Sequence, residues 1–158
     1  EMKDILQKVT VLTPDGTVQT LSVEELELSY RHSIIPEKGY LVISAVLKLQ
    51  PGNADEIQSI MDDLKEKRVS KQPLEYPSAG STFKRPEGYF AGKLIQDAGL
   101  RGFRVGGAQV SEKHCGFIIN RDQATSTDIC QLMQQVSEIV YEKFGVRLEP
   151  EVKKIGEF

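Results

Sequence analysis

Residues 71–86 limit what the middle of this chain can form. Three prolines fall within these sixteen residues. Because proline fixes φ and lacks a backbone N–H donor, neither a long helix nor a central strand can run through the segment. The segment also shows no helical or strand periodicity, and long loops in compact domains are commonly functional. We therefore predict a functional loop, to which Lys71, Lys84 and Arg85 contribute positive charge.

The residues before this loop indicate a strand-rich region. β-Branched runs at 9–13 and 17–21 flank a Pro-Asp-Gly turn, which predicts a hairpin. A Ser-x-x-Glu capping signal then predicts a short helix over residues 24–28. Residues 30–36 are interpreted as a loop. The apolar run at 40–49 predicts a strand that is buried on both faces.

A proline-glycine pair follows that strand and suggests a domain boundary. It precedes a stretch in which Ile57, Ile60, Met61 and Leu64 keep the i, i+3, i+4, i+7 spacing of an amphipathic helix ending near Arg68. We therefore expect one domain over residues 1–50 and a second over residues 51–158.

The residues after the loop predict mixed helices and strands. A short helix over 91–98 ends at a glycine, strands are expected over 103–110 and 115–119, and a long helix over 126–144. A Gly-Gly pair within the first of these strands is interpreted as a turn or bulge. Residues 146–152 predict a closing strand. Because strands and helices do not alternate regularly, the fold class is α+β.

Composition and charge exclude several classes of partner. The chain has 158 residues and a net charge of −3, so no overall positive field favours nucleic acid or an anionic membrane. Its longest apolar run is too short to span a bilayer, and no signal peptide is recognisable, which favours a cytoplasmic protein. Cys115 and Cys130 form no metal-binding motif, so no metal site is expected.

Three polar residues admit both a structural and a functional interpretation. Ser81 is either a turn serine or a reactive hydroxyl, but the G-x-S-x-G motif of hydrolases is absent. Arg31 is either a surface arginine or, beside Tyr30, a clamp for a carboxylate. Glu151 is either the outward residue of a strand or a participant in proton transfer. His114 is more often structural than catalytic in such a context.

Several longer segments of the sequence resemble one enzyme family. They are Tyr30-Arg31 and residues 78–86, 88–95, 98–102, 107–114, 116–120 and 148–156, and they occur in the family's order over essentially the whole chain. The family is UDP-N-acetylenolpyruvoylglucosamine reductase, a flavoenzyme of peptidoglycan precursor synthesis. The sequence resembles its shorter, type II branch, because the other branch has Asn at the position of Arg85.

The resemblance implies a fold and an activity. It implies that the chain, which begins Glu1-Met2, is the C-terminal portion of the enzyme. Residues 1–50 would complete a flavin-binding subdomain, and residues 51–158 would form an α+β substrate-binding domain. The implied cofactors are FAD and NADPH, which together deliver hydride to the enolpyruvyl ether of UDP-N-acetylglucosamine enolpyruvate to make UDP-N-acetylmuramate. Most flavin contacts would come from an N-terminal FAD domain outside this chain.

The same resemblance assigns roles to individual residues. Arg31 would hold the substrate carboxylate, Ser81 would protonate the α carbon, and Glu151 would assist at the carboxylate. Lys153 stands where some members have Arg, so a bidentate contact is not expected there. The expected substrate-binding residues are Tyr30, Arg68, Lys71, Lys84 and His114, while flavin-binding residues are left unassigned.

Two alternatives remain open. Without the flavin segment, the chain could be a non-catalytic UDP-sugar-binding domain. It could also belong to another flavoprotein of related architecture that acts on a different substrate, although that reading would require a different set of residues around Ser81.

Overall fold

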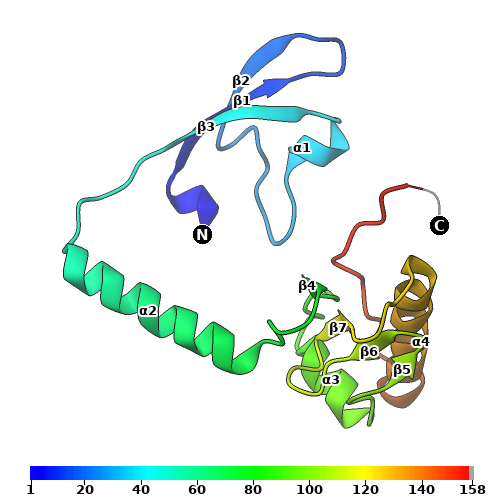
Figure 1. Ribbon diagram of the computed structural model, residues 1–158. Helices are drawn as coiled ribbons and strands as arrows, with labels where there is room; N and C mark the ends of the chain where they lie inside the picture. Colours follow the sequence, from blue (N-terminus) through cyan, green and yellow to red (C-terminus); the bar gives the residue numbers. More distant parts are fainter. Residues whose placement is uncertain (157–158) are drawn as a thin grey trace. The chain divides into compact units, whose positions relative to one another are not determined.

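A computed structural model describes residues 1–156. The chain divides into two compact units, one covering Glu1–Ile57 and the other beginning at Gln58 (Figure 1). Each unit has its own hydrophobic core. Mixed helix and sheet confirm the α+β class.

The N-terminal unit is built on a three-stranded antiparallel sheet in the order β2-β1-β3. Strand β1 spans Leu6–Leu12, β2 spans Val18–Ser22 and β3 spans Leu41–Leu47. A 3-10 helix, η1 (Met2–Asp4), precedes β1, and a single helical turn, α1 (Ile34–Glu37), precedes β3. Side chains from β1, β2 and the following turn form the core: Leu6, Val9, Val11, Leu21 and Leu26.

The predicted hairpin over residues 9–21 is confirmed. β1 and β2 pair in continuous register from Lys8↔Ser22 to Leu12↔Val18. Gly16 has a φ of 84°, which only glycine adopts without strain, and its N–H donates to the Thr13 carbonyl at 2.9 Å. The Pro-Asp-Gly turn therefore sets the hairpin as its sequence predicts.

The predicted helix over residues 24–28 is wrong, although its capping bonds form. The Ser22 N–H donates to the Glu25 carboxylate at 2.8 Å, and the Glu25 N–H donates to the Ser22 hydroxyl at 3.3 Å. Glu27 has a φ of 49°, outside the right-handed helical region, so the segment stays a turn.

The predicted loop over residues 30–36 is partly wrong, because α1 begins at Ile34. Pro36 is the third residue of that helix. The first N–H groups of a helix have no partner within the helix, so a proline is tolerated there.

Strand β3 is present as predicted, but the expectation that it is buried on both faces is wrong for the described residues. All seven of its residues are exposed, with Leu41 at 64% and Ile43 at 54%. Within residues 1–156, β3 pairs only with β1 and is an edge strand. A long, apolar edge strand is a template for pairing with further chain.

Helix α2 (Ala54–Lys71) includes the boundary between the two units. The Asn53 side chain caps it by accepting the N–H groups of Asp55 at 2.9 Å and Glu56 at 3.1 Å. The predicted apolar stripe of α2 is exposed to solvent, since every residue of this helix is exposed.

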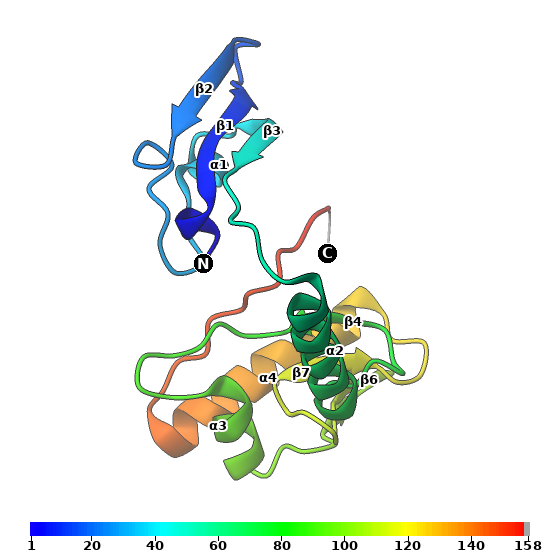
Figure 2. The same cartoon turned by 90° about the vertical axis from the view of Figure 1, so that its left-hand side faces the viewer.

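The C-terminal unit has a four-stranded antiparallel sheet in the order β4-β7-β6-β5. All four strands are labelled in Figure 1, and β4, β7 and β6 are also labelled in Figure 2. Helices α3 (Ala91–Asp97) and α4 (Ser126–Phe144) contact each other, and α4 packs on β5, β6 and β7. The strands are β4 (Ser78–Ser81), β5 (Arg104–Val105), β6 (Ala108–Val110) and β7 (Phe117–Asn120).

Helix α4 has the bounds and the apolar stripe that the sequence predicts. Thr125 and Asp128 form a reciprocal capping box, and Gly145 ends the helix at a φ of 68°. Its buried face is Leu132, Met133, Val136 and Val140. Within residues 1–156, no helix is both long and apolar enough to cross a membrane.

Two predictions in the C-terminal unit need correction. The segment 71–86 is not a loop throughout, because β4 forms inside it. Residues 146–152 are not a regular strand, since they make only an isolated bridge between Pro150 and Phe83.

Candidate functional site

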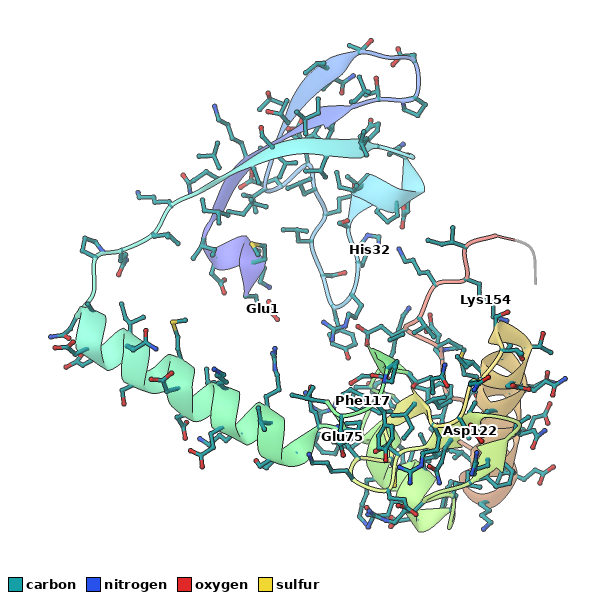
Figure 3. The ribbon with its side chains drawn as sticks, in the orientation of Figure 1. Glu1, His32, Glu75, Phe117, Asp122 and Lys154 are labelled. Carbon is teal, nitrogen blue, oxygen red and sulfur yellow. The ribbon has the colours of Figure 1, made fainter. Side chains whose placement is uncertain are left out.

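Ser81 is the last residue of β4, the edge strand of the C-terminal sheet. Ser78 pairs with Ile119 and Ser81 pairs with Phe117, so β4 has one more residue than β7 between these pairs. Gly80 lies in this bulge with a φ of 83°. A bulge redirects the side chain that follows it, and Ser81 is exposed. Phe117, its partner, is labelled in Figure 3.

Thr82 fixes the backbone next to Ser81. Its side chain is buried, and its hydroxyl oxygen accepts the Ile118 N–H at 3.0 Å. Its own N–H donates to the Gly116 carbonyl at 2.8 Å. The position of Ser81 is therefore set by a neighbour held to β7 through both backbone and side chain.

Glu151 is brought to the same place by backbone pairing. Its N–H donates to the Thr82 carbonyl at 2.9 Å, and the Lys84 N–H donates to the Glu149 carbonyl at 2.8 Å. These two bonds flank the bridge between Phe83 and Pro150. The structure thus places the segment that carries Glu151 beside the segment that carries Ser81.

Lys84 adds a side-chain link to this pairing. Its ammonium group forms an ion pair with the Glu149 carboxylate, and Lys84 is partly buried whereas Glu149 is exposed. This ion pair joins the two segments at Glu149, which lies two residues before Glu151. One predicted substrate-binding cation is therefore engaged with a carboxylate in this structure.

Arg68 and Lys71 lie on the last turn of α2 and are exposed. This helix end is tied to the C-terminal unit by Lys113, which donates to the Val69 carbonyl at 2.9 Å and forms an ion pair with Glu75 at 3.6 Å. Arg68 and Lys71 are three residues apart, so both cations lie on one face of the helix.

His114 is packed into the C-terminal unit. Its Nδ1 accepts the Gly116 N–H at 3.1 Å, and its ring meets Phe117 edge-on with centroids 5.1 Å apart. A Cβ at Gly92 would lie 3.3 Å from the imidazole, so His114 also touches the start of α3. These contacts give His114 a structural role. The structure offers no test of the predicted role in binding substrate.

Tyr30 and Arg31 belong to the N-terminal unit. They occupy the tip of a turn closed by backbone hydrogen bonds between Ser29 and His32 at 3.2 and 3.3 Å. Arg31 has a φ of 56° and its guanidinium lies 5.4 Å from the Tyr30 ring centroid. A non-glycine residue at positive φ costs free energy, and such strain collects at functional sites. Both residues line a hollow of about 350 Å³ together with Leu28.

Thr82 and Glu149 are the site residues that the sequence analysis missed. Thr82 is indistinguishable in sequence from any loop threonine, and its hydrogen bond crosses 36 positions. Glu149 could have been predicted from the sequence. In an extended segment the side chains alternate between two sides, so Glu149 lies on the same side as Glu151. Its partner Lys84 lies 65 positions away and gives no local pattern.

Cys115 is a buried free thiol. Burial raises the pKa of this thiol, which favours its protonated form. Among the described residues, no group of three or more His, Cys, Asp and Glu side chains is arranged to bind a metal ion.

Gly16 and Gly39 are the glycines with positive φ in the N-terminal unit. Gly16 lies in a hairpin turn and Gly39 lies directly after α1. Neither follows a strand and opens a helix, which is the arrangement that cradles a pyrophosphate in doubly wound α/β folds.

By fold, this chain is similar to about half of a solved reductase. The crystal structure of UDP-N-acetylenolpyruvylglucosamine reductase from Thermus caldophilus matches 96% of this chain and 54% of that chain, with a TM-score of 0.80 and 37% sequence identity.

The family model described as UDP-N-acetylenolpyruvoylglucosamine reductase, C-terminal domain, matches residues 72–155. The chain therefore belongs to this family. The reductase of Agathobacter rectalis is 65% identical over all of this chain and 50% of its own length, and that of Clostridioides difficile is 56% identical over 99% of this chain and 52% of its own length. The chain spans about half the length of the curated relatives it matches.

Proposed function

We propose that this chain is the C-terminal half of a UDP-N-acetylenolpyruvoylglucosamine reductase that acts in the cytoplasm. In the complete protein, NADPH and FAD supply hydride, and the substrate is UDP-N-acetylglucosamine enolpyruvate. In this proposal, residues 1–50 complete the flavin-binding subdomain and residues 51–158 bind the substrate. Family membership and the 65% identity to a named reductase support the proposal.

The single observation that carries the assignment of residues is the hydrogen bond from the Glu151 N–H to the Thr82 carbonyl. It joins Thr82, the residue after Ser81, to a residue 69 positions further along the chain. Two of the three proposed catalytic residues thus share one short stretch of paired backbone. The third, Arg31, is presented at a strained turn in the N-terminal unit.

The proposed reduction requires a proton donor for the α carbon and a positive charge beside the substrate carboxylate. Addition of hydride to the β carbon of the enolpyruvyl group places negative charge on the α carbon and its carboxylate. In our proposal Arg31 binds the carboxylate through its planar guanidinium, and the Ser81 hydroxyl gives its proton to the α carbon. Glu151 assists at the carboxylate within a hydrogen-bonded network. Because a serine hydroxyl is a weak acid, this transfer needs a strongly basic carbanion and nearby positive charge.

The cations of the C-terminal unit suit an anionic nucleotide sugar. We propose that Arg68 and Lys71, both exposed at the end of α2, meet the diphosphate. Lys84, Tyr30 and His114 complete the proposed contacts, with Lys84 exchanging Glu149 for the substrate. His114 also holds the Gly116 backbone beside Thr82.

The exposed strand β3 is where the rest of the polypeptide would pack. Its apolar residues and unpaired edge would be covered when the missing N-terminal FAD domain is present. This assignment accounts for a strand that reads as buried in sequence yet lies exposed in the described residues.

The test separates the two half-reactions in the complete enzyme. In Ser81→Ala, NADPH should still reduce the flavin, while reoxidation by the enolpyruvyl substrate slows by a factor of about 10² to 10⁴, the usual contribution of a general acid. Ser70→Ala, which removes an exposed hydroxyl from α2, is the control and should alter neither step. An equal loss of both half-reactions in Ser81→Ala would refute the proton-donor role.

A non-catalytic UDP-sugar-binding role for this chain alone is the second candidate, and the exposed cations Arg68 and Lys71 would serve it as well. The visible absorption spectrum of the purified 158-residue chain distinguishes a flavin-binding chain from one that binds only the UDP-sugar. Flavin absorbance in that spectrum would exclude the binding-only role. Its absence, with substrate heat detected by calorimetry, would support that role for the isolated chain.

A further inference from the structure

A cavity of about 420 Å³ lies within the C-terminal unit and has no role in the proposed reaction. It is bounded by β4, β7, the N-terminal part of α4 and residues 152–154. Its apolar wall consists of Pro77, Ala79, Ile118, Ile129, Met133 and Val152. Neither Ser81 nor Glu151 lines it.

The polar groups on the wall are largely satisfied by the protein. The Thr82 hydroxyl accepts the Ile118 N–H, and the Asn120 side-chain oxygen accepts the Ala124 N–H at 2.8 Å. An occupant would therefore gain most from apolar contact. A volume of this size falls in the usual range for small-molecule sites, which is about 300–1,000 Å³.

The charge on the lining is of one sign. Lys153 and Lys154 line the cavity, and no Asp or Glu does. Within residues 1–156, neither lysine is engaged in an ion pair. Lys154 is labelled in Figure 3, on the C-terminal tail beside the start of α4. The lining thus combines an apolar interior with two cations.

We propose that this cavity binds a small amphiphilic carboxylate. Its apolar chain or ring would lie between β4 and α4, and its carboxylate would meet Lys153 and Lys154. Apolar surface removed from water supplies most of the affinity, and the lysines select the charged head.

The cavity is coupled to the candidate site through the backbone. Thr82 follows Ser81, Val152 follows Glu151, and both Thr82 and Val152 line the cavity. The same backbone hydrogen bond joins Glu151 to Thr82. An occupant therefore pushes on both segments at once. The consequence for turnover rests on the proposed function, whereas binding of the carboxylate does not.

The experiment is a ¹H–¹⁵N NMR titration of the 158-residue chain with 4-phenylbutyrate. Saturable shifts are expected at Ala79, Ile118 and Cys130, accompanied by shifts at the Ser81 and Glu151 amides. The neutral 4-phenylbutyramide should bind about threefold to fivefold more weakly, the effect of losing a solvent-exposed ion pair. Equal affinity for the acid and the amide would overturn the role of the lysines.

Two pairs of variants complete the test. Cys130→Phe, which fills the cavity from α4, should abolish the shifts, whereas Gln135→Phe, at an exposed position of the same helix, should leave them unchanged. The double variant Lys153→Gln/Lys154→Gln should lower the affinity for the acid to that for the amide, and Lys65→Gln should not. If the shifts are absent, or fall only on the exposed apolar residues of β3 and α2, the proposal is wrong. Failure of UDP-sugar binding would count against the proposed function alone.

Discussion

The hydroxyl of Thr82 is the structural feature on which the position of Ser81 most depends, and Thr82→Val tests it. Valine keeps the branched shape but cannot accept the Ile118 N–H, whose hydrogen bond is 3.0 Å long and buried. Thr82 is 4% exposed, so water cannot easily replace the lost acceptor. Leaving a buried donor unsatisfied costs about 1–3 kcal/mol, and we expect the free energy of unfolding of the C-terminal unit to fall by about 2 kcal/mol.

The assay is urea unfolding followed by circular dichroism at 222 nm. Helices α3 and α4 and nearly all of α2 belong to the C-terminal unit, so the helical signal reports mainly on that unit. With a denaturant slope of about 1–3 kcal/mol/M, a loss of this size lowers the unfolding midpoint by about 1 M. Thr127→Val, at an exposed position in the first turn of α4, is the matched control and should change the midpoint little.

An equal midpoint for the two valine variants would refute this reasoning. The register of β4 against β7 would then depend on the backbone pairing of the two strands and not on the Thr82 hydroxyl. Hydrogen exchange at the Ile118 amide gives a second readout, since its protection should fall in Thr82→Val and stay unchanged in Thr127→Val.

Two further predictions concern the turns and caps of the C-terminal unit. A Cβ at Gly107 would lie 2.0 Å from the Asp122 carbonyl oxygen, so Gly107→Ala should lower the free energy of unfolding by about 1–3 kcal/mol or more, measured by the same urea unfolding. Gly99→Ala is the control, because a Cβ there meets nothing within 4 Å although φ is 81°. It should lower the free energy of unfolding by less than Gly107→Ala does. A larger loss in Gly99→Ala would contradict the argument that the clash at Gly107 dominates. Hydrogen bonds from Thr125 lower the pKa of Asp128 in the folded chain, so its contribution to stability is complete above the ordinary aspartate pKa of about 3.9 and is lost as the pH falls through the lower folded pKa. The difference in unfolding free energy between the wild type and Asp128→Asn should therefore shrink below about pH 4, and a difference that is constant from pH 2 to pH 6 would contradict this assignment.

Local signals were sufficient for much of the fold. The Pro-Asp-Gly turn gave the β1–β2 hairpin, and the capping residues and apolar stripe of α4 gave its bounds, because both depend on residues that are close in sequence. The Gly106-Gly107 pair is the β5–β6 turn, one of the two structures expected for it. These elements needed no knowledge of the tertiary structure.

Other features depend on distant partners and could not be read locally. The Ser78–Ser81 strand forms because β7 offers it an edge, despite a glycine bulge that hides any strand periodicity. Residues 146–152 form only an isolated bridge to Phe83 and not the predicted strand, and their partner lies more than sixty positions away in the sequence. The apolar pattern of β3 correctly predicted a strand, but burial depends on neighbours that the described residues do not supply.

The candidate site shows the same division between features set by neighbouring residues and features set by distant partners. Ser81 was singled out from its loop, whereas Glu151 was assigned to the same site only by the family resemblance. Its backbone link to Thr82, which spans nearly half the chain, was not predicted. The roles of Arg31, Ser81 and Glu151, and of the substrate-binding residues, remain predictions. Backbone geometry supports only the pairing of the Ser81 and Glu151 segments.

A double-mutant cycle on Ser81 and Glu151 tests the central claim, that these two residues act as one unit on the substrate. The measurement is the rate at which the enolpyruvyl substrate reoxidises the reduced complete enzyme in Ser81→Ala, Glu151→Gln and the double variant. The account predicts that the double variant loses little more than the worse single variant, with a coupling free energy of at least about 1 kcal/mol. Strictly multiplicative losses would contradict it, because they would show that Ser81 and Glu151 act independently.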